Sequence, residues 1–257
     1  MTALTRAVSP TLAACELTWR PRERIDITKA IEQHDAYERA LAELGLHVIS
    51  LPAEPDLPDA TFVEDPLVVV HEVAIVTRLG AASRRPESES LAAAIAPFRP
   101  VRRLREPATL EGGDVMRIGR DVFVGLSSRT NEAGIAQLRI ELEPFGYRVH
   151  RVDVLGCLHL KSACCSLGDG KILANPAWLD PAPLHDYRII GVAEAEPGAA
   201  NVLRIGDTIL MPTSFPHTEE ILHREGFNIK TIDISELIKA EAAITCSIVI
   251  FKTGEHA

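Results

Sequence analysis

One thiol, one histidine and one acidic residue interrupt β-rich sequence at positions where a purely structural strand would not place them. The thiol is Cys246 in the run AITCSIVIF, and the histidine is His159 between two leucines. A cysteine nucleophile needs a partner that promotes the thiolate and a proton donor for the leaving group, and histidine can supply both. Glu111, in LEGGDV, is the candidate acceptor that would orient the histidine. These residues predict covalent catalysis by cysteine.

Further charged residues predict a binding site for a substrate with two opposite charges. Asp59, Glu64 and Asp65 lie close together in DATFVED and would bind a cation. Arginine binds carboxylates bidentately, and the candidates are Arg129 and one of the two arginines at 84–85. A substrate with a cationic end and a carboxylate end is an amino acid such as arginine or one of its relatives.

Each of these residues also has an ordinary structural interpretation. A lone strand cysteine is usually a small buried hydrophobe, and a histidine flanked by leucines is often a satisfied core residue. Acidic pairs before a strand are common in turns, and an arginine such as Arg129 often forms a simple salt bridge. The cysteines and histidine at 157–165 also suggest zinc, but they lack the separated pairs typical of a structural zinc site. The catalytic interpretation is favoured because the residues occupy the same phase of different repeats.

A repeated unit of hairpin, helix and strand carries these residues. Each hairpin pairs two short β-rich runs across a turn, and turns of Gly and Asp type are a strong local hairpin signal. We expect hairpins at 68–78, 112–127, 164–176 and 201–213, helices at 26–45, 88–98, 131–146 and 218–227, and single strands at 47–53, 147–154 and 228–234.

The repeat length, roughly 35 to 50 residues, is in the range of radial or stacked repeats. Four units are complete, and the fifth is divided between CSIVIF (246–251) and TRAVSP (5–10). A repeat shared by the two termini closes a ring, so we predict one α/β domain over 1–257, a five-bladed α/β propeller. The rival is a doubly wound Rossmann sheet, which needs single strands alternating with helices and a GxGxxG turn. The GDGK stretch at 168–171 lacks the spacing of a phosphate loop and predicts a hairpin turn.

Composition excludes several classes of function. The chain has 257 residues, 46% of them hydrophobic, and a formal net charge of -9. This balance argues against sequence-independent nucleic-acid binding, which needs a basic footprint. No apolar run approaches the ~20 residues of a membrane helix, and the N-terminal segment lacks the apolar core of a signal peptide. The five cysteines are not spaced as a disulfide framework, which suits a reducing cytoplasm. We therefore expect a cytoplasmic protein whose partner is a small-molecule substrate, with no nucleic acid and no membrane.

The sequence also resembles a known family, the dimethylarginine dimethylaminohydrolases of the guanidino-group-modifying (pentein) superfamily. The similar motifs, in the family's order, are FVED (62–65), LEGGDV (110–115), FVGLSSRTN (123–131), LHLKSACC (158–165) and AAITCSIVIF (242–251). The resemblance covers nearly the whole chain and implies the five-bladed propeller of ββαβ-type repeats. It also implies hydrolysis of asymmetric dimethylarginine and monomethylarginine to citrulline plus dimethylamine or methylamine, with no cofactor and no metal.

The resemblance implies a role for each site residue. It makes Cys246 the nucleophile that forms a covalent thiouronium, His159 the general acid and base, and Glu111 the residue that orients the histidine. The implied substrate contacts are Glu64 and Asp65 for the guanidinium, Asp59 as a further holding group, Arg84 and Arg129 for the carboxylate, Leu17 in a lid, and Ala240 through its backbone. The choice between Arg84 and Arg85 stays open.

Three related functions remain as alternatives. Arginine deiminases use similar chemistry but usually carry an inserted helical module, and amidinotransferases are longer. A non-catalytic ribosome anti-association factor shares the propeller, but that function gives no reason to keep thiol, histidine and acids in phase. A homodimer also stays open, since some relatives form dimers.

Overall fold

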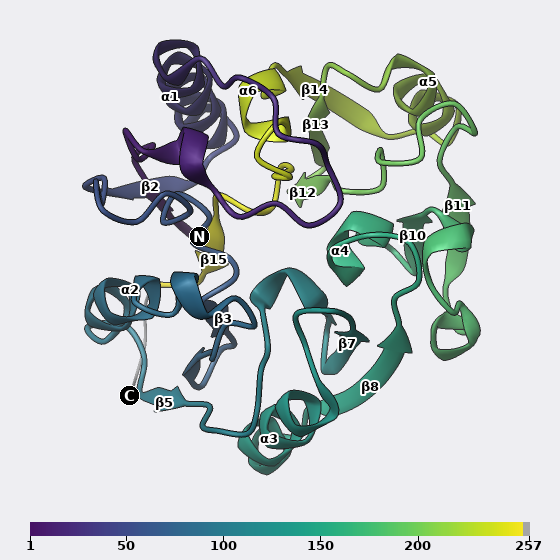
Figure 1. Cartoon of the computed structure of the whole chain (residues 1–257). Helices are drawn as coiled ribbons and strands as arrows, with labels where there is room; N and C mark the ends of the chain where they lie inside the picture. The colour runs from purple at the N-terminus through teal and green to yellow at the C-terminus, as the bar shows by residue number, and fades with distance from the viewer. Residues whose placement is uncertain (254–257) are drawn as a thin grey trace.

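The computed structural model describes residues 1–253, and its strands form five three-stranded sheets around a common axis (Figure 1). In every sheet the first strand is antiparallel to the middle strand, and the last strand is parallel to it. The sheets are β15(Val249–Phe251)–β1(Thr2–Arg6)–β2(His47–Leu51), β3(Leu67–Val69)–β4(Ala74–Val76)–β5(Val101–Arg103), β6(Val115–Ile118)–β7(Asp121–Leu126)–β8(Arg148–Asp153), β9(Cys164–Gly168)–β10(Lys171–Ala174)–β11(Arg188–Gly191) and β12(Leu203–Ile205)–β13(Thr208–Pro212)–β14(Asn228–Ile232). The prediction of a five-bladed α/β propeller is confirmed.

Helices connect the middle and last strands in four of the sheets and lie at the periphery (Figure 1). They are α1(Ile27–Glu43), α2(Glu87–Ile95), α3(Glu132–Leu142) and α5(Pro216–Arg224), and two further short helices are α4(Leu160–Ala163) and α6(Ser235–Ile238). Short polar side chains set where α1 and α3 begin. The Asp26 carboxylate accepts from Lys29 N, and the Asn131 side chain accepts from Gly134 N. These caps agree with the polar residues that precede each apolar pattern.

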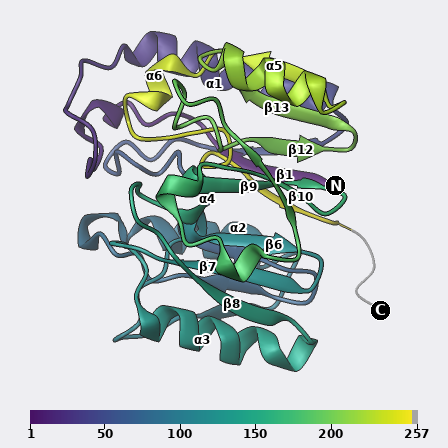
Figure 2. The ribbon, with the colours of Figure 1, turned by 90° about the vertical axis from the view of Figure 1, so that its right-hand side faces the viewer.

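The first strands of the sheets lie innermost. β15 contacts β3, β6 contacts β9, and β9 contacts β12, so these strands form a ring around the axis. The sheet at the chain ends is closed by β15 and β1, which pair Thr2 with Phe251 and Leu4 with Val249. Figure 2 shows the labelled N-terminus at one end of the ring and the N-terminal loop that precedes α1 at the other end.

Two details of the predicted terminal repeat are wrong. The N-terminal strand is Thr2–Arg6 rather than 5–10, because the chain turns after residue 7 into a 3-10 helix at Leu12–Ala14. Cys246 lies in a turn before β15 rather than in a strand.

The unit that begins with the hairpin at 164–176 is also incomplete, because it lacks an α-helix. The connection from β10 to β11 contains the 3-10 helices Pro176–Trp178 and Ala182–Leu184 in place of an α-helix. Prolines at 176, 181 and 183 remove backbone donors and clash with helical turns, so this segment does not continue as an α-helix. Sequence patterning also missed β5 and β11, which are only three and four residues long.

No helix among residues 1–253 is both long enough and apolar enough to cross a membrane.

Candidate active site

Four loops that lead into the first strand of a sheet carry the predicted catalytic and acidic residues. Asp65 precedes β3, and Glu111 precedes β6. His159 precedes α4 and β9, and Cys246 precedes β15. Because the first strands form the inner ring, these loops meet at one end of the ring, around its axis. We call this end the mouth of the axis. The fifth sheet contributes Asn201 at the same position before β12, a residue that sequence reasoning did not single out.

Asn201 positions the turn that carries the thiol. Its side-chain amide donates to Thr245 Oγ1 at 3.0 Å, and its Oδ1 accepts from Thr245 N at 3.0 Å. The same amide donates to the backbone oxygen of Lys161 at 3.0 Å. Asn201 therefore ties the cysteine turn to the segment that follows His159. The one sequence signal for this role is its position, because Asn201 precedes the first strand of its sheet as the candidate catalytic residues do.

His159 and Glu111 form a buried pair. Nε2 of His159 lies 2.7 Å from Oε2 of Glu111, and the other carboxylate oxygen accepts from Gly80 N at 3.0 Å. Arg129 Nη1 reaches that second oxygen at 3.4 Å. Burial alone raises the pKa of Glu111, but the hydrogen bond and charge of His159 outweigh it and lower the pKa to about 2. Glu111 is therefore an ionised acceptor that fixes the imidazole.

The charges around His159 favour its protonated form. Burial lowers the pKa of this histidine, but nearby Asp65, Asp114 and Glu111 outweigh burial and raise the pKa to about 9. Nδ1 of His159 lies 3.9 Å from Oδ1 of Asp65. Asp114 accepts from Leu160 N at 2.8 Å, which holds the backbone next to the histidine. At neutral pH this imidazolium is a proton donor.

Gly112 and Gly113 of LEGGDV allow close packing between the loop that carries the paired acids and the loop that carries His159. A Cβ on Gly113 would lie 2.5 Å from Nδ1 of His159 and 2.9 Å from Oδ1 of Asp65. A Cβ on Gly112 would lie 2.0 Å from the backbone oxygen of Glu64. Gly113 N instead donates to Oδ1 of Asp65 at 3.1 Å. Glycine is needed here for close packing rather than for a left-handed backbone.

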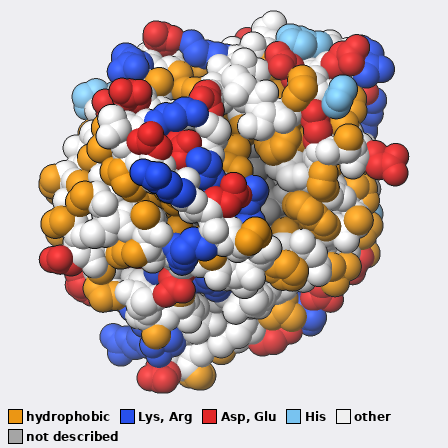
Figure 3. All heavy atoms as spheres, turned by 45° about the horizontal axis from the view of Figure 1, so that its top comes forward, with side chains coloured by type: hydrophobic (Ala, Val, Ile, Leu, Met, Phe, Trp, Pro, Cys, Tyr) orange, Lys and Arg blue, Asp and Glu red, His pale blue; other side chains and the backbone are white. Residues whose placement is uncertain are grey.

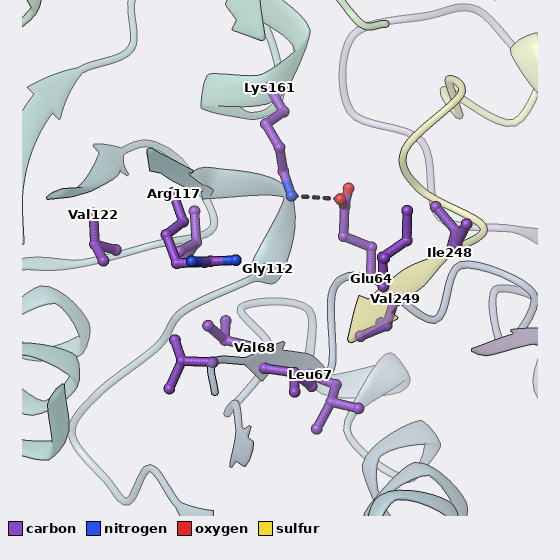
Figure 4. Close-up of a pocket in the computed structure, with 13 residues that line it drawn as sticks. Glu64, Leu67, Val68, Gly112, Arg117, Val122, Lys161, Ile248 and Val249 are labelled. Atoms are coloured by element: carbon purple, nitrogen blue, oxygen red, sulfur yellow. Dashed lines mark hydrogen bonds and ion pairs between the residues drawn. The ribbon is translucent and has the colours of Figure 1, made fainter. Parts of the chain in front are cut away.

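The paired acids Glu64 and Asp65 have different partners. Asp65 Oδ2 accepts from Arg84 Nη1 at 2.9 Å. Glu64 accepts from Thr245 Oγ1 at 2.8 Å and from Lys161 Nζ, the contact drawn in Figure 4. Burial raises the pKa of Glu64 even though Lys161 opposes the shift. The LHLKS motif contains Lys161 but does not indicate its role, because Glu64 is 97 positions away in the chain.

Arg84 rather than Arg85 lies within the acidic cluster. Arg84 Nε and Nη2 donate to the two oxygens of Glu87 at 3.1 and 3.0 Å, in addition to the Asp65 contact. The Arg85 side chain instead donates from Nε to the backbone oxygen of Leu79 at 3.1 Å. Two carboxylates thus hold the Arg84 guanidinium in this structure.

Cys246 is half-buried beside the acids. Its Sγ accepts from Ala243 N at 3.4 Å, and its backbone oxygen accepts from Glu64 N at 3.1 Å. Burial first, and then the negative charges of Glu64 and Asp65, raise the pKa of the Cys246 thiol. A cation placed beside the thiol would oppose this shift, because an opposite charge favours the thiolate.

A loop before α1 covers this mouth of the axis. Leu17 packs against the core and is partly buried. Glu16 N donates to Oδ2 of Asp59 at 3.0 Å, and Arg129 Nη2 donates to Thr18 Oγ1 at 2.8 Å. Burial raises the pKa of Asp59. The loop thus contacts two residues that were predicted to bind substrate. Figure 3 shows a hollow in this part of the molecule, with charged side chains along one side and hydrophobic ones along the other.

Ala240 completes the predicted set, and the thiols at 157–165, which suggested zinc, are buried as well. Ala240 is buried and donates from its backbone N to Leu237 O at 2.9 Å. The thiols of Cys157 and Cys165 donate to two different backbone oxygens, those of His159 and Lys161. Among residues 1–253, Asp65, Glu111 and His159 could together hold a metal ion, since their ligand atoms lie within 4.8 Å of one another.

A five-bladed propeller with a thiol, a histidine–glutamate pair and buried acids at one mouth defines a guanidino-group-modifying (pentein) enzyme. Residues 13–161 match the family model described as eukaryotic N,N-dimethylarginine dimethylhydrolase. The chain is 42% identical over 245 residues to the N(G),N(G)-dimethylarginine dimethylaminohydrolase of Streptomyces coelicolor, covering 95% of this chain and 94% of that protein. It therefore belongs to the dimethylarginine dimethylaminohydrolase family.

Solved structures agree with this assignment. A cysteine-to-serine mutant of the Pseudomonas aeruginosa enzyme in complex with citrulline matches with a TM-score of 0.92 and 33% identity, covering 97% of this chain and 98% of that one. A histidine-to-glycine dimethylarginine dimethylaminohydrolase, solved as an adduct with S-methyl-L-thiocitrulline, matches with a TM-score of 0.93 and 33% identity over 97% and 99%.

Proposed function

We propose that this chain hydrolyses asymmetric dimethylarginine and monomethylarginine to citrulline plus dimethylamine or methylamine. The observation that carries the proposal is the meeting of Cys246, the His159–Glu111 pair and the acids Glu64 and Asp65 at one mouth of the axis. The relative that is 42% identical bears this enzyme name, and the Pseudomonas relative was solved with citrulline bound. The class of activity is a cysteine-dependent hydrolase of C–N bonds other than peptide bonds.

The substrate guanidinium binds against Glu64 and Asp65 in this proposal. Asp65 accepts from Arg84 Nη1 at one oxygen and from Gly113 N at the other, so its carboxylate is already oriented by donors. Asp59 and the backbone of Ala240 would hold the amino-acid end, and Leu17 would cover it. Arg129 would bind the substrate carboxylate and exchange its contact with Thr18 for the new one. Arg84 would donate to the substrate carboxylate as well, although its guanidinium already donates to Asp65 and Glu87.

The first half of the proposed reaction forms a covalent intermediate. The cationic substrate offsets the field of the acids, so the thiol of Cys246 loses its proton to solvent as the substrate binds. The thiolate attacks the guanidinium carbon and forms a C–S bond. His159, protonated at neutral pH, gives its proton to the departing nitrogen, and the C–N bond breaks to release dimethylamine or methylamine. Cys246 is left as a thiouronium.

The second half uses the same histidine as a base. Neutral His159 takes a proton from water, and the resulting hydroxide equivalent attacks the thiouronium carbon. Collapse of that adduct breaks the C–S bond, which yields citrulline and restores the thiolate. Glu111 keeps the imidazole in one orientation through both steps and stabilises its charged form.

The test compares citrulline release from asymmetric dimethylarginine and from arginine, for the wild type and Cys246→Ser. We expect faster release from the methylated substrate and none from the variant. Turnover of arginine at an equal or higher rate would support the deiminase alternative and refute the proposal. Full activity in Cys246→Ser would refute the nucleophile assignment.

We also propose that the whole chain, 1–257, acts as one cofactor-free catalytic unit in the cytoplasm. The five free cysteines suit a reducing compartment. Exhaustive dialysis against EDTA should leave the rate unchanged, and a loss restored by added metal would refute this. A homodimer is the alternative to a monomer, and light scattering at several concentrations distinguishes them.

A further inference from the structure

Three consecutive backbone N–H groups of the loop over the site donate to a single carboxylate, that of Glu241. Thr18 N donates to Oε2 at 2.9 Å, and Trp19 N donates to Oε1 at 2.5 Å. Arg20 N donates to Oε1 as well. Successive N–H groups that converge in this way form a small concavity that binds anions. Here a side chain from the other end of the chain fills it.

Glu241 is held in a conformation that non-glycine residues rarely adopt. Its φ is +58°, and within residues 1–253 the only other non-glycine residue with a positive φ is Asp169, at +50°. A left-handed backbone costs free energy for a residue with a Cβ and persists where the surroundings hold it. Glu241 directly follows Ala240 and opens the turn whose Ala243 N donates to the sulfur of Cys246. The carboxylate therefore connects the loop to the nucleophile's own turn.

The other two loop anchors described above are residues that the proposed reaction also needs. Asp59 holds Glu16, and Arg129 holds Thr18. When substrate binds, Asp59 and Arg129 must turn some of their hydrogen bonds toward it. Glu241 lies outside the proposed set of substrate contacts. Its hydrogen bonds to the loop can therefore stay in place while substrate is bound.

Ser83 Oγ also donates to the Glu16 carboxylate at the start of the loop, whereas residues 18–20 have little buried apolar surface. The Trp19 side chain is 55% exposed, and it borders a cavity of about 320 Å³ that is also lined by Trp178, Phe215 and Glu241. A loop with little buried apolar surface depends on its hydrogen bonds to stay in place.

We propose that Glu241 is a positioning residue, which keeps loop 16–20 closed over the bound methylarginine through the N–H groups of residues 18–20. The inference rests on the proposed function and adds a determinant of substrate affinity to it. Glu241 touches neither the thiol nor the imidazole. Its removal weakens substrate retention and leaves the bond-making steps of Cys246 and His159 in place.

The key variant is Glu241→Gly, because glycine adopts a positive φ without the steric cost of a Cβ. This variant removes the carboxylate and at the same time relieves the backbone, so its thermal midpoint should not fall. The matched control is Asp169→Gly in the hairpin between β9 and β10, which also removes a left-handed acidic residue, together with its 2.7 Å contact to Arg204.

Two measurements test the role. Amide hydrogen exchange of a peptide covering residues 16–20, without substrate, should be faster in Glu241→Gly than in the wild type and unchanged in Asp169→Gly. The KM for asymmetric dimethylarginine should rise by at least about tenfold, the scale of lost hydrogen bonds to a charged group, while kcat stays within about threefold. Glu241→Gln keeps one carbonyl acceptor. Its loop exchange rate and its KM should therefore lie between those of the wild type and those of Glu241→Gly.

Each contrary result has one meaning. Unchanged exchange in the loop overturns the anchor, and an unchanged KM overturns its role in substrate retention. A loss of kcat and of thermal stability together would make Glu241 a structural residue only and overturn the proposal. If the wild type releases no citrulline from methylarginine, the proposed function fails, and the exchange measurement still reports on the anchor.

Discussion

Nε2 of His159 lies 2.7 Å from Oε2 of Glu111, and both side chains are buried. The two residues come from successive blades, 48 positions apart in the chain. The carboxylate holds the buried imidazole in one orientation. A charged, oriented donor is then ready for the leaving nitrogen.

Replacing Glu111 by Gln should weaken the acid without removing the hydrogen-bonding shape. The charge of Glu111 helps hold the pKa of His159 at about 9, so Glu111→Gln should lower that pKa, as followed by NMR titration of the ring. kcat should fall on the order of 10²-fold, the lower range for loss of general acid catalysis. Glu89→Gln, on an exposed ion pair with Arg103, is the control and should change neither quantity. An unaltered His159 titration in Glu111→Gln would contradict the assigned pairing.

The same pair should give the free energy of unfolding a defined pH dependence. The pKa of Glu111 is lowered to about 2, so its contribution is present above its unfolded value of 4.5 and is lost as pH falls toward 2. The pKa of His159 is raised to about 9, so its contribution is present below 6.5 and is lost as pH rises through 9.

The pair should therefore stabilise the fold most between pH 4.5 and 6.5. Urea unfolding at pH 6 and at pH 9 should show a decline in the wild type that is smaller in Glu111→Gln. If the free energy of unfolding declined less between pH 6 and pH 9 in the wild type than in Glu111→Gln, the pair would not be the main source of the pH dependence.

The positions of the loops that carry the candidate catalytic residues could be predicted because they depend on a local repeat. Asp65, Glu111, His159 and Cys246 each precede a first strand, and this phase is visible as polar residues before short β-rich runs. β5 is as short as β3 and β4, but it stands alone, without the hairpin turn that marked those two strands, so nothing in the pattern indicated it.

The sequence analysis paired Glu111 with His159, and the two side chains lie 2.7 Å apart. Most other contacts that hold the site together could not be predicted, because they join distant positions. Thr245 donates to Glu64 across 181 positions, and Thr18 N donates to Glu241 across 223. A motif records which side chains are present, but only the closed ring brings such pairs together. The resemblance to a known family supplied roles for Leu17 and Ala240 that no spacing rule contains.

The thiol of Cys246 should react slowly in the free enzyme. Burial and the charges of Glu64 and Asp65 raise its pKa, so little thiolate exists near neutral pH. Alkylation by iodoacetamide should accelerate as pH rises. Asp65→Asn should speed the reaction at a fixed pH, because it removes one of the opposing charges. The Cys246→Ser variant gives the background from the other four thiols, which are buried. Fast alkylation of the wild type at pH 7 would contradict this environment.

Lys161 should stabilise the fold by neutralising Glu64 rather than by touching substrate. Its Nζ donates to Glu64 Oε1, with the two side chains only 15% and 10% exposed (Figure 4). Lys161→Met leaves a buried carboxylate whose remaining side-chain donor is Thr245, at 2.8 Å. Breaking a buried ion pair from one side costs roughly 3 kcal/mol, so the urea midpoint should fall clearly.

The double variant Lys161→Met with Glu64→Gln separates this cause from lost packing. Removing both charges leaves a neutral amide that still accepts from Thr245, so much of the lost free energy of unfolding should return. Glu64→Gln alone leaves Lys161 as the uncompensated charge, and that single variant completes the cycle. If the two losses simply add, Lys161 acts through its packing and the ion pair contributes nothing. Recovery of stability without recovery of citrulline release would separate the two roles of Glu64, because the neutral amide supports the fold but no longer attracts the substrate cation.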